Sequence, residues 1–205
     1  MRNRLLHIAF VICTTILLGV TNTYAQLDVQ QLTEQQGLGN NTINEIHQDK
    51  KGFLWIGTDI GITRYDGNFF HTYKLSREGG GEPISVNNIQ ETEDRYLWIL
   101  SEEGQIACFD KQQEKYIPIQ WGEGIKPENI YQISSTGEFL YAISSDGLHI
   151  VNVKSDGKMI SLEKKKLLSN TKLNAVITGY QQTLFLTDKD NQLIAYETQS
   201  EKSSV

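Results

Sequence analysis

The sequence predicts an all-β fold built from four β-propeller blades, each a repeat of about 43 residues and together part of a larger propeller. An aliphatic pair with three-residue spacing recurs four times, and a Leu-aromatic-apolar triplet follows each pair after a short polar turn. This period fits a four-stranded blade of roughly 40 to 50 residues and exceeds that of ankyrin or tetratricopeptide units. The pairs are Ile43/Ile46, Val86/Ile89, Ile130/Ile133 and Leu173/Val176, and the triplets begin at Leu54, Leu97, Leu140 and Leu184.

Within each repeat the pattern is that of short strands. Runs such as 53–58 and 96–101 are rich in aromatic and β-branched residues, as expected of strands buried on both faces between neighbouring blades. Asp-Gly pairs at Asp66, Asp146 and Asp156 favour hairpins, because both residue types tolerate the positive φ of tight turns. We therefore expect blades over residues 42–75, 85–120, 129–163 and 173–198.

The strands follow one another in chain order. Blade one is expected to hold 42–47, 53–58, 62–65 and 69–74, and blade two 85–91, 96–101, 105–109 and 115–119. Blade three is expected to hold 129–134, 138–144, 148–153 and 158–162. Blade four shows 174–179, 183–187 and 192–196, and then a polar tail with no outer strand.

A propeller is stable when its first and last blades meet, because a bare end exposes an apolar face and unpaired strand edges. Residues 27–32 alternate apolar and polar side chains and are the candidate for a closing outer strand. That strand would complete either blade four, giving a small four-bladed ring, or a later blade that this sequence lacks.

The amino terminus resembles an export signal rather than part of the fold. Arg2 and Arg4 precede a mostly apolar run, and small and polar residues follow up to Ala25. This pattern predicts a signal peptide over residues 1–25 and a periplasmic or secreted product. An uncleaved anchor is the alternative, but the run is shorter than the ~20 apolar residues needed to span a bilayer. The mature chain has no other candidate transmembrane segment.

Composition excludes several partners and chemistries. The net charge of −6, without a basic cluster, argues against binding to nucleic acid or to an anionic membrane surface. The mature chain would hold one cysteine, Cys108, in an apolar stretch, so no internal disulfide is expected.

No catalytic or cofactor-binding constellation stands out. His47, His71 and His149 are scattered over different strands or turns without zinc-ligand spacing. The paired acids Glu93-Asp94 and Glu102-Glu103 fall in predicted turns, where they favour solubility. We expect no catalytic residue, no metal site and no cofactor.

The aromatic residues divide into two groups. Trp55, Trp98, Tyr141 and Phe185 share one position of the repeat, which predicts packing between blades. Trp121 lies outside the repeat frame in a glycine-flanked connection. There it would either stack on a sugar ring or cover a blade edge, and it is the one ligand-binding candidate.

Residues 38–67 resemble the first repeat of the two-component regulator propellers in hybrid two-component sensors of Bacteroidetes. The resemblance rests on an asparagine before the first strand, on Asp-x-x-Gly before Leu-Trp-Ile-Gly-Thr, and on Gly-x-x-x-Tyr-Asp-Gly. Blade two keeps Val86-Asn87-Asn88-Ile89, Leu97-Trp98-Ile99 and Phe109-Asp110 but has Leu100-Ser101 in place of Gly-Thr. Blades three and four keep only the apolar skeleton.

The resemblance implies a periplasmic, seven-bladed sensor propeller that binds oligosaccharides on its loop face. In such proteins a membrane helix and a histidine kinase follow, and a homodimer is expected only in the full-length sensor. This chain has no kinase motif, so it resembles the amino-terminal piece of a sensor, and a free-standing small propeller is the alternative.

The leading hypothesis is therefore a non-catalytic, ligand-sensing propeller segment, membrane-tethered if it belongs to a longer sensor. Two other functions stay open. One is a secreted propeller enzyme such as a polysaccharide lyase or hydrolase, which requires converging acids or a metal. The other is a scaffold that docks proteins through exposed edges.

Overall fold

The computed structural model describes residues 29–77, 81–122, 130–137, 139–145, 147–156, 158–169, 173–178, 183–188, 190–197 and 202–204, together with Arg4 and His7. The chain divides into two units, Met1–Gln31 and Leu32–Val205. Most of the predicted signal peptide and residues 27 and 28 lie outside the described residues. No described helix is long and apolar enough to cross a membrane.

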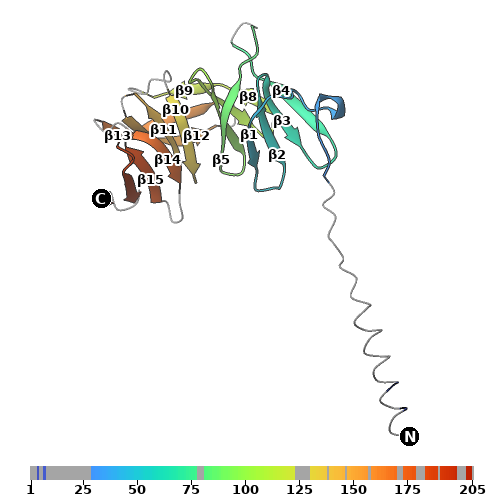
Figure 1. Ribbon diagram of the computed structural model, residues 1–205. Helices are drawn as coiled ribbons and strands as arrows, with labels where there is room; N and C mark the ends of the chain where they lie inside the picture. Colours follow the sequence, from blue (N-terminus) through green and yellow to red (C-terminus); the bar gives the residue numbers. More distant parts are fainter. Residues whose placement is uncertain are drawn as a thin grey trace. The chain divides into compact units, whose positions relative to one another are not determined.

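The second unit is built from antiparallel sheets, as predicted. Its described residues form four sheets that follow one another in chain order (Figure 1), and each corresponds to one sequence repeat. Blade one contains β1 (Ile43–Gln48), β2 (Leu54–Thr58), β3 (Gly61–Tyr65) and β4 (Phe70–Lys74). Blade two contains β5 (Val86–Thr92), β6 (Tyr96–Ser101), β7 (Ile106–Asp110) and β8 (Lys115–Ile117).

Blades three and four continue the plan. Blade three contains β10 (Ile130–Thr136), β11 (Phe139–Ser144), β12 (Gly147–Ser155) and β13 (Ile160–Ser169), with β9 (Ile119–Trp121) added at its edge. Blade four contains β14 (Leu173–Thr178), β15 (Thr183–Asp188), β16 (Leu193–Glu197) and β17 (Lys202–Ser204). The all-β propeller-blade prediction is confirmed.

The structure places three boundaries differently from the sequence analysis. The last strand of blade two, expected over 115–119, ends at Ile117. Residues 119–121 form β9, which pairs in parallel with β13 of blade three, with Trp121 opposite Leu162. The outer strand of blade three continues to Ser169. Blade four does have an outer strand, because β17 pairs with β16 within the tail that was expected to lack one. Pairing at the edge of a sheet is made by backbone hydrogen bonds. A short polar segment can therefore add to an edge without any hydrophobic pattern that would predict it.

The segment before blade one is not a strand over its described part, residues 29–32. Instead a short 3₁₀ turn, η1 (Glu34–Gln36), is capped by Thr33 and ends at Gly37. This segment continues onto blade one: a Cβ added at Gly37 would meet Phe70, and one added at Gly39 would lie 2.6 Å from Oγ1 of Thr72. It therefore lies against the two outer strands of the blade.

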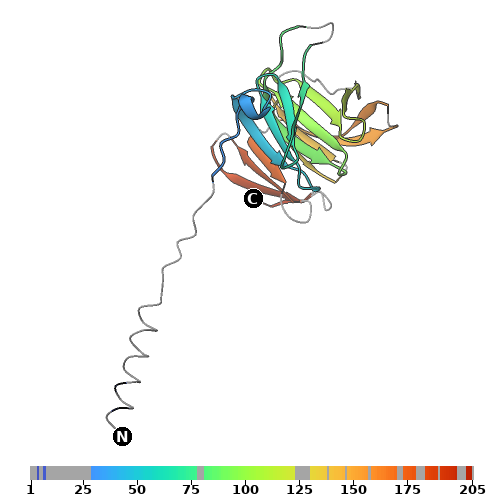
Figure 2. The ribbon, with the colours of Figure 1, turned by 90° about the vertical axis from the view of Figure 1, so that its right-hand side faces the viewer.

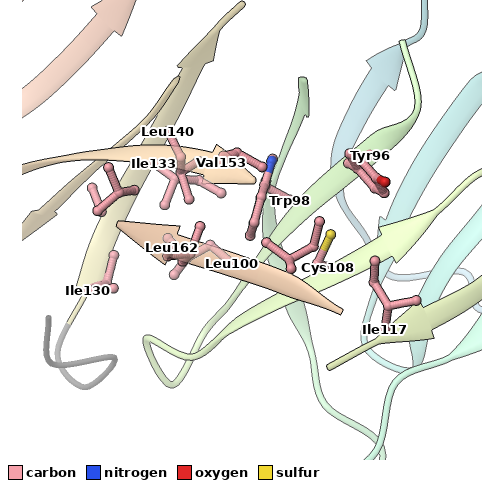
Figure 3. Packing of buried hydrophobic residues seen from close by; sticks show 13 residues of the cluster. Tyr96, Trp98, Leu100, Cys108, Ile117, Ile130, Ile133, Leu140, Val153 and Leu162 are labelled. Carbon is pink, nitrogen blue, oxygen red and sulfur yellow. The ribbon is translucent and has the colours of Figure 1, made fainter. Parts of the chain in front are cut away.

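Buried apolar side chains of the described residues form three clusters, one at each junction between neighbouring blades. Figure 3 shows the junction of blades two and three, where Trp98 and Cys108 face Ile133 and Leu162. At the junction of blades one and two the Trp55 ring meets the Phe109 ring edge-on, with centroids 5.4 Å apart. Figure 2 shows these two blades side by side.

The exposed fraction of the repeated aromatic side chain depends on whether another blade packs against it. Trp55, Trp98 and Tyr141 are 1%, 0% and 0% exposed, whereas Phe185 of blade four is 39% exposed. The side chains at this position thus pack against the following blade where one is present. The packing role predicted for this row holds for its first three members.

Candidate functional site

A buried charged cluster joins blades one and two. Lys111 Nζ donates a hydrogen bond to Asp49 Oδ2 at 3.0 Å and a second one to Glu91 Oε1. The three side chains are only 5%, 1% and 7% exposed. His47 Nε2 lies 3.9 Å from the Glu91 carboxylate. The cluster pairs groups from both blades in the interior of the interface.

Asp49 is the organising member of this cluster. Its Oδ1 accepts hydrogen bonds from the backbone N–H of Lys51 at 2.9 Å and of Phe53 at 3.0 Å, which closes the turn between β1 and β2. Its Oδ2 accepts the indole N–H of Trp55 at 2.9 Å. Burial pushes the pKa of this carboxyl upward, but the hydrogen bonds from Trp55 and Lys111 outweigh burial and leave the pKa below its usual value.

This arrangement explains the Asp-x-x-Gly-x-Leu-Trp spacing of blade one. In blade two Thr92 takes the place of Asp49, and its Oγ1 accepts the indole N–H of Trp98 at 2.9 Å. The indole acceptor is thus kept where the carboxylate is lost. With its members enclosed and mutually paired, the cluster stabilises the junction and offers no open position to a substrate.

An open groove lies where the connections between blades meet the β6–β7 turn. It has a volume of about 470 Å³ and is lined by the segments Leu75–Arg77 and Pro118–Ile119, by parts of β7 and β8, and by Trp121. We call it the Trp121 groove. Arg77 and Gln105 add polar groups to a lining that includes the half-buried Trp121. A cavity of this size with an aromatic wall and a few polar groups is typical of small-molecule sites.

Trp121 lies in a short strand rather than in the loop that the sequence predicts. The residue ends β9, and its neighbour Gly122 donates a backbone hydrogen bond to Leu162 O at 2.9 Å. Its side chain also packs against the cluster between blades two and three. Trp121 therefore combines local packing with a place in the groove wall. Its role in ligand binding stays a prediction.

A second cavity has a volume of about 530 Å³ and shares no lining residue with this groove. We call it the polar pocket; its lining includes Asn44, Asp59, Ser85, Asn87 and Glu102. Asp59 Oδ1 accepts hydrogen bonds from Asn44 Nδ2 and Ser85 Oγ, each at 3.0 Å. These two bonds lower the pKa of Asp59. The Glu102 N–H donates to Ser85 O at 3.1 Å, which joins two residues of the pocket wall.

Sequence reasoning missed the polar pocket. A signal was present, because Asn44 and Asn87 occupy the same position of successive repeats. The pocket forms only because the first strands of blades one and two lie next to each other.

The other residues considered from the sequence are not gathered into a site. His47, His71 and His149 lie in β1, β4 and β12, and His149 is buried with its Nε2 2.9 Å from Ser144 Oγ. Cys108 is buried, which raises the pKa of its thiol. Among the described residues no group of three or more His, Cys, Asp or Glu side chains could hold a metal ion.

The paired acids lie in turns, as predicted. Glu93 and Asp94 adopt positive φ angles of 52° and 55° between β5 and β6. Asp94 pairs with Lys50, and Glu103 pairs with Arg77 at the rim of the Trp121 groove.

Comparison with known proteins identifies the first repeat. The family model described as Two component regulator propeller matches residues 37–59, which include the Asp49 turn and the Trp55 strand. Blade one carries a two-component regulator propeller repeat. A 58-residue stretch is 34% identical to Histidine kinase P4 of Formosa agariphila, covering 28% of this chain and 4% of the kinase. The chain therefore spans a small part of that relative.

Several solved structures share the fold. The extracellular domain of BT4673 from B. thetaiotaomicron, described as a hybrid two component system, aligns with a TM-score of 0.54 at 17% identity, covering 80% of this chain and 21% of its own. The extracellular domain of BT3049 from the same organism aligns at 0.51 and 16% identity, covering 85% and 31%. A chain of the Mitotic Checkpoint Complex aligns at 0.59 and 12%, covering 90% and 60%. At these identities the likeness shows the fold alone.

Proposed function

We propose that this chain is a non-catalytic, ligand-sensing propeller segment of a hybrid two-component sensor, exposed outside the cytoplasm, and that its ligand is an oligosaccharide. The match of blade one to the regulator propeller family carries the sensory part of the proposal. The folds of the extracellular domains described above and the signal-like amino terminus support the location.

The Trp121 groove supports the choice of ligand. Its wall combines the apolar face of Trp121 with side chains that donate and accept hydrogen bonds, including Gln105, Ser76 and Arg77. A sugar ring presents the matching surfaces, an apolar C–H face and a rim of hydroxyl groups. The polar pocket offers further amide and carboxylate groups that could bind sugar hydroxyl groups.

The charged groups support a binding role rather than catalysis. Asp49 and Glu91 are enclosed with Lys111 and line neither cavity. Asp59 and Glu102 do line the polar pocket, where Asn44 and Ser85 both donate hydrogen bonds to the Asp59 carboxylate. A general acid–base pair needs carboxylates that reach a bound substrate with different pKa values. In the full sensor, ligand binding would bias two arrangements of a homodimer by a coupling free energy of ~1 to 3 kcal/mol.

Isothermal titration of the purified chain against a panel of neutral, amino and acidic oligosaccharides tests the proposal. We expect saturable binding of one class. Trp121→Ala is expected to weaken that binding by roughly tenfold, about 1.4 kcal/mol, because the stacking face is lost. Trp121→Phe keeps a ring and is expected to retain most of the affinity.

Phe69→Ala is the matched control, because Phe69 is an exposed aromatic residue in the turn between β3 and β4, outside the groove. It should bind like the wild type. Product analysis of the same mixtures completes the experiment. Cleavage of any oligosaccharide would contradict the non-catalytic proposal and indicate an enzyme. No measurable heat of binding with any class would refute the proposed oligosaccharide ligand.

A further inference from the structure

The two cavities differ in the charge of their walls. Among the described residues that line the Trp121 groove, Arg77 is the only charged one. The charged residues that the structure places in the wall of the polar pocket, Asp59 and Glu102, are both acidic. Hydrogen bonds led by that from Asn44 lower the pKa of Asp59, so this carboxyl is ionised at neutral pH. A charged ligand would therefore favour one cavity or the other according to the sign of its charge.

The connection between blades one and two holds Arg77 at the groove. This connection folds back on itself, because the Ile84 N–H donates a hydrogen bond to Leu75 O at 2.8 Å. Ser76 also pairs with Pro83 in an isolated antiparallel bridge. Arg77 comes directly after these paired residues, so its backbone leaves from a fixed position in the groove wall.

The present partner of Arg77 is easily exchanged. Nη2 of Arg77 donates a hydrogen bond to Oε1 of Glu103, in the turn between β6 and β7. The two side chains are 61% and 49% exposed, and ion pairs at such exposed positions contribute little to stability because water screens them. Glu103 is absent from the described lining of the groove, whereas Arg77 belongs to it. The guanidinium can therefore turn from Glu103 to an anionic group in the groove at small cost.

The other residues of the groove strengthen an interaction with an anion. Ile84, Cys108 and Ile117 are buried apolar residues of its lining, and the half-buried Trp121 adds an aromatic surface. An ion pair formed beside apolar surface is screened less by water than one at an open surface. A guanidinium also donates two parallel hydrogen bonds to a planar carboxylate or to a phosphate-like anion. The groove thus combines a place for a sugar ring with one cationic group.

We propose that Arg77 selects an oligosaccharide that carries an anionic group, a uronate carboxylate or a sulfate ester, for the Trp121 groove. This inference rests on the proposed oligosaccharide-binding function and adds the chemical class of the ligand. The guanidinium exchanges the Glu103 carboxylate for the anionic group, while Trp121 covers the apolar face of the sugar ring. The chain carries a net charge of −6, so the attraction is local to Arg77. The acidic wall of the polar pocket keeps the anionic group out of that cavity.

Isothermal titration of the purified chain with matched sugars tests this inference. The probes are trigalacturonate, its uncharged methyl ester, a galactose trisaccharide with and without a sulfate ester, and a trisaccharide of glucosamine. We expect at least one anionic probe to bind about tenfold more tightly than its uncharged counterpart, because only the anion pairs with the guanidinium. The pair of probes that shows this difference distinguishes a carboxylate ligand from a sulfate ligand.

Substitutions of Arg77 and its partner give the decisive comparison. Arg77→Gln should reduce the affinity for the anionic probe to that for its uncharged counterpart, whose own affinity stays the same. Arg77→Lys keeps the charge but lacks the two parallel donors, so its preference should be intermediate. Glu103→Gln should strengthen binding of the anionic probe, because the guanidinium no longer has to leave a carboxylate. Lys51→Gln removes a charge from an exposed residue in the β1–β2 turn, outside both cavities, and should bind like the wild type.

The outcomes separate this inference from the proposed function. Equal binding of charged and uncharged probes, tightest binding of the glucosamine trisaccharide, or an Arg77→Gln variant that keeps the preference would overturn the role of Arg77 and leave an oligosaccharide sensor. Weaker binding of the anionic probe by Glu103→Gln would overturn the exchange of partners. Absence of binding with all five probes would overturn both proposals. Circular dichroism melts check the fold of each variant, and unchanged melting temperatures are expected because the substituted residues are exposed.

Discussion

Replacing Asp49 by alanine tests the central interaction of blade one. The substitution removes the acceptor of the Trp55 indole, two backbone bonds that close the β1–β2 turn, and one partner of Lys111. A buried donor without a partner costs about 1 to 3 kcal/mol, and breaking a buried ion pair costs about 3 to 5 kcal/mol. These terms overlap because they share one carboxylate, so we expect a loss of about 3 to 5 kcal/mol in the free energy of unfolding.

The expected change in melting temperature follows from the size of the domain. For domains of roughly 150 to 250 residues, 1 kcal/mol shifts the melting temperature by about 2 to 4 °C. Asp49→Ala should therefore lower it by roughly 6 to 20 °C in calorimetry or circular dichroism. Urea unfolding at constant slope gives the free-energy difference directly.

A graded control comes from the chain itself. Asp49→Thr copies blade two, where the hydroxyl of Thr92 accepts the Trp98 indole. This variant restores the indole partner but not the partner of Lys111, so its stability should fall between that of the wild type and that of Asp49→Ala. A melting temperature of Asp49→Ala within 1 °C of the wild type, or an Asp49→Thr variant as unstable as the alanine variant, would refute the reasoning.

Two further predictions concern backbone strain and acid stability. Gly61→Ala should destabilise the fold by about 2 to 4 kcal/mol in chemical denaturation, because φ is 126° and the new Cβ would lie 2.4 Å from the backbone carbonyl oxygen of Tyr73. Gly67→Ala is the control: φ is 98° but the space around the new Cβ is open, so it should cost only about 1 kcal/mol. Burial raises the pKa of Asp110, but hydrogen bonds led by those from Arg95 bring it down to about 2 from 3.8. Its contribution of about 2 kcal/mol is present above pH ~4 and lost as the pH falls towards 2, so Asp110→Asn should flatten the acid limb of a stability–pH curve. An unchanged limb, or equal losses for the two alanine variants, would contradict these accounts.

The repeat pattern allowed much of the fold to be predicted, because burial between blades demands the same residue types at the same positions. Trp55 and Trp98 are examples: each lies in the second strand of its blade, fully buried against the next one. Trp121 was harder. Its strand pairs with β13, some forty residues further along the chain, and three residues at a sheet edge carry no periodicity from which that pairing can be inferred.

The candidate site could be predicted only in part. An aromatic residue outside the repeat frame pointed to Trp121, and the groove wall is where the structure places it. The polar pocket brings Asn44 of blade one within 3.1 Å of Ser85 of blade two. The repeated asparagine, Asn44 and Asn87, marks this position in the sequence, but the contact itself forms only because β1 and β5 pack together. The buried pairing of Asp49 with Lys111 was likewise invisible, since the two residues are far apart in the chain.

The amino-acid sequence by itself determined the blade count of this chain, the strand character of each repeat and the regulator propeller relationship of blade one, because these depend on local periodicity and short-range turn chemistry. Only the tertiary structure decided which charges meet and where the cavities open. Those features arise from residues distant in sequence, and their energies depend on burial, which exists only once neighbouring sheets have packed together.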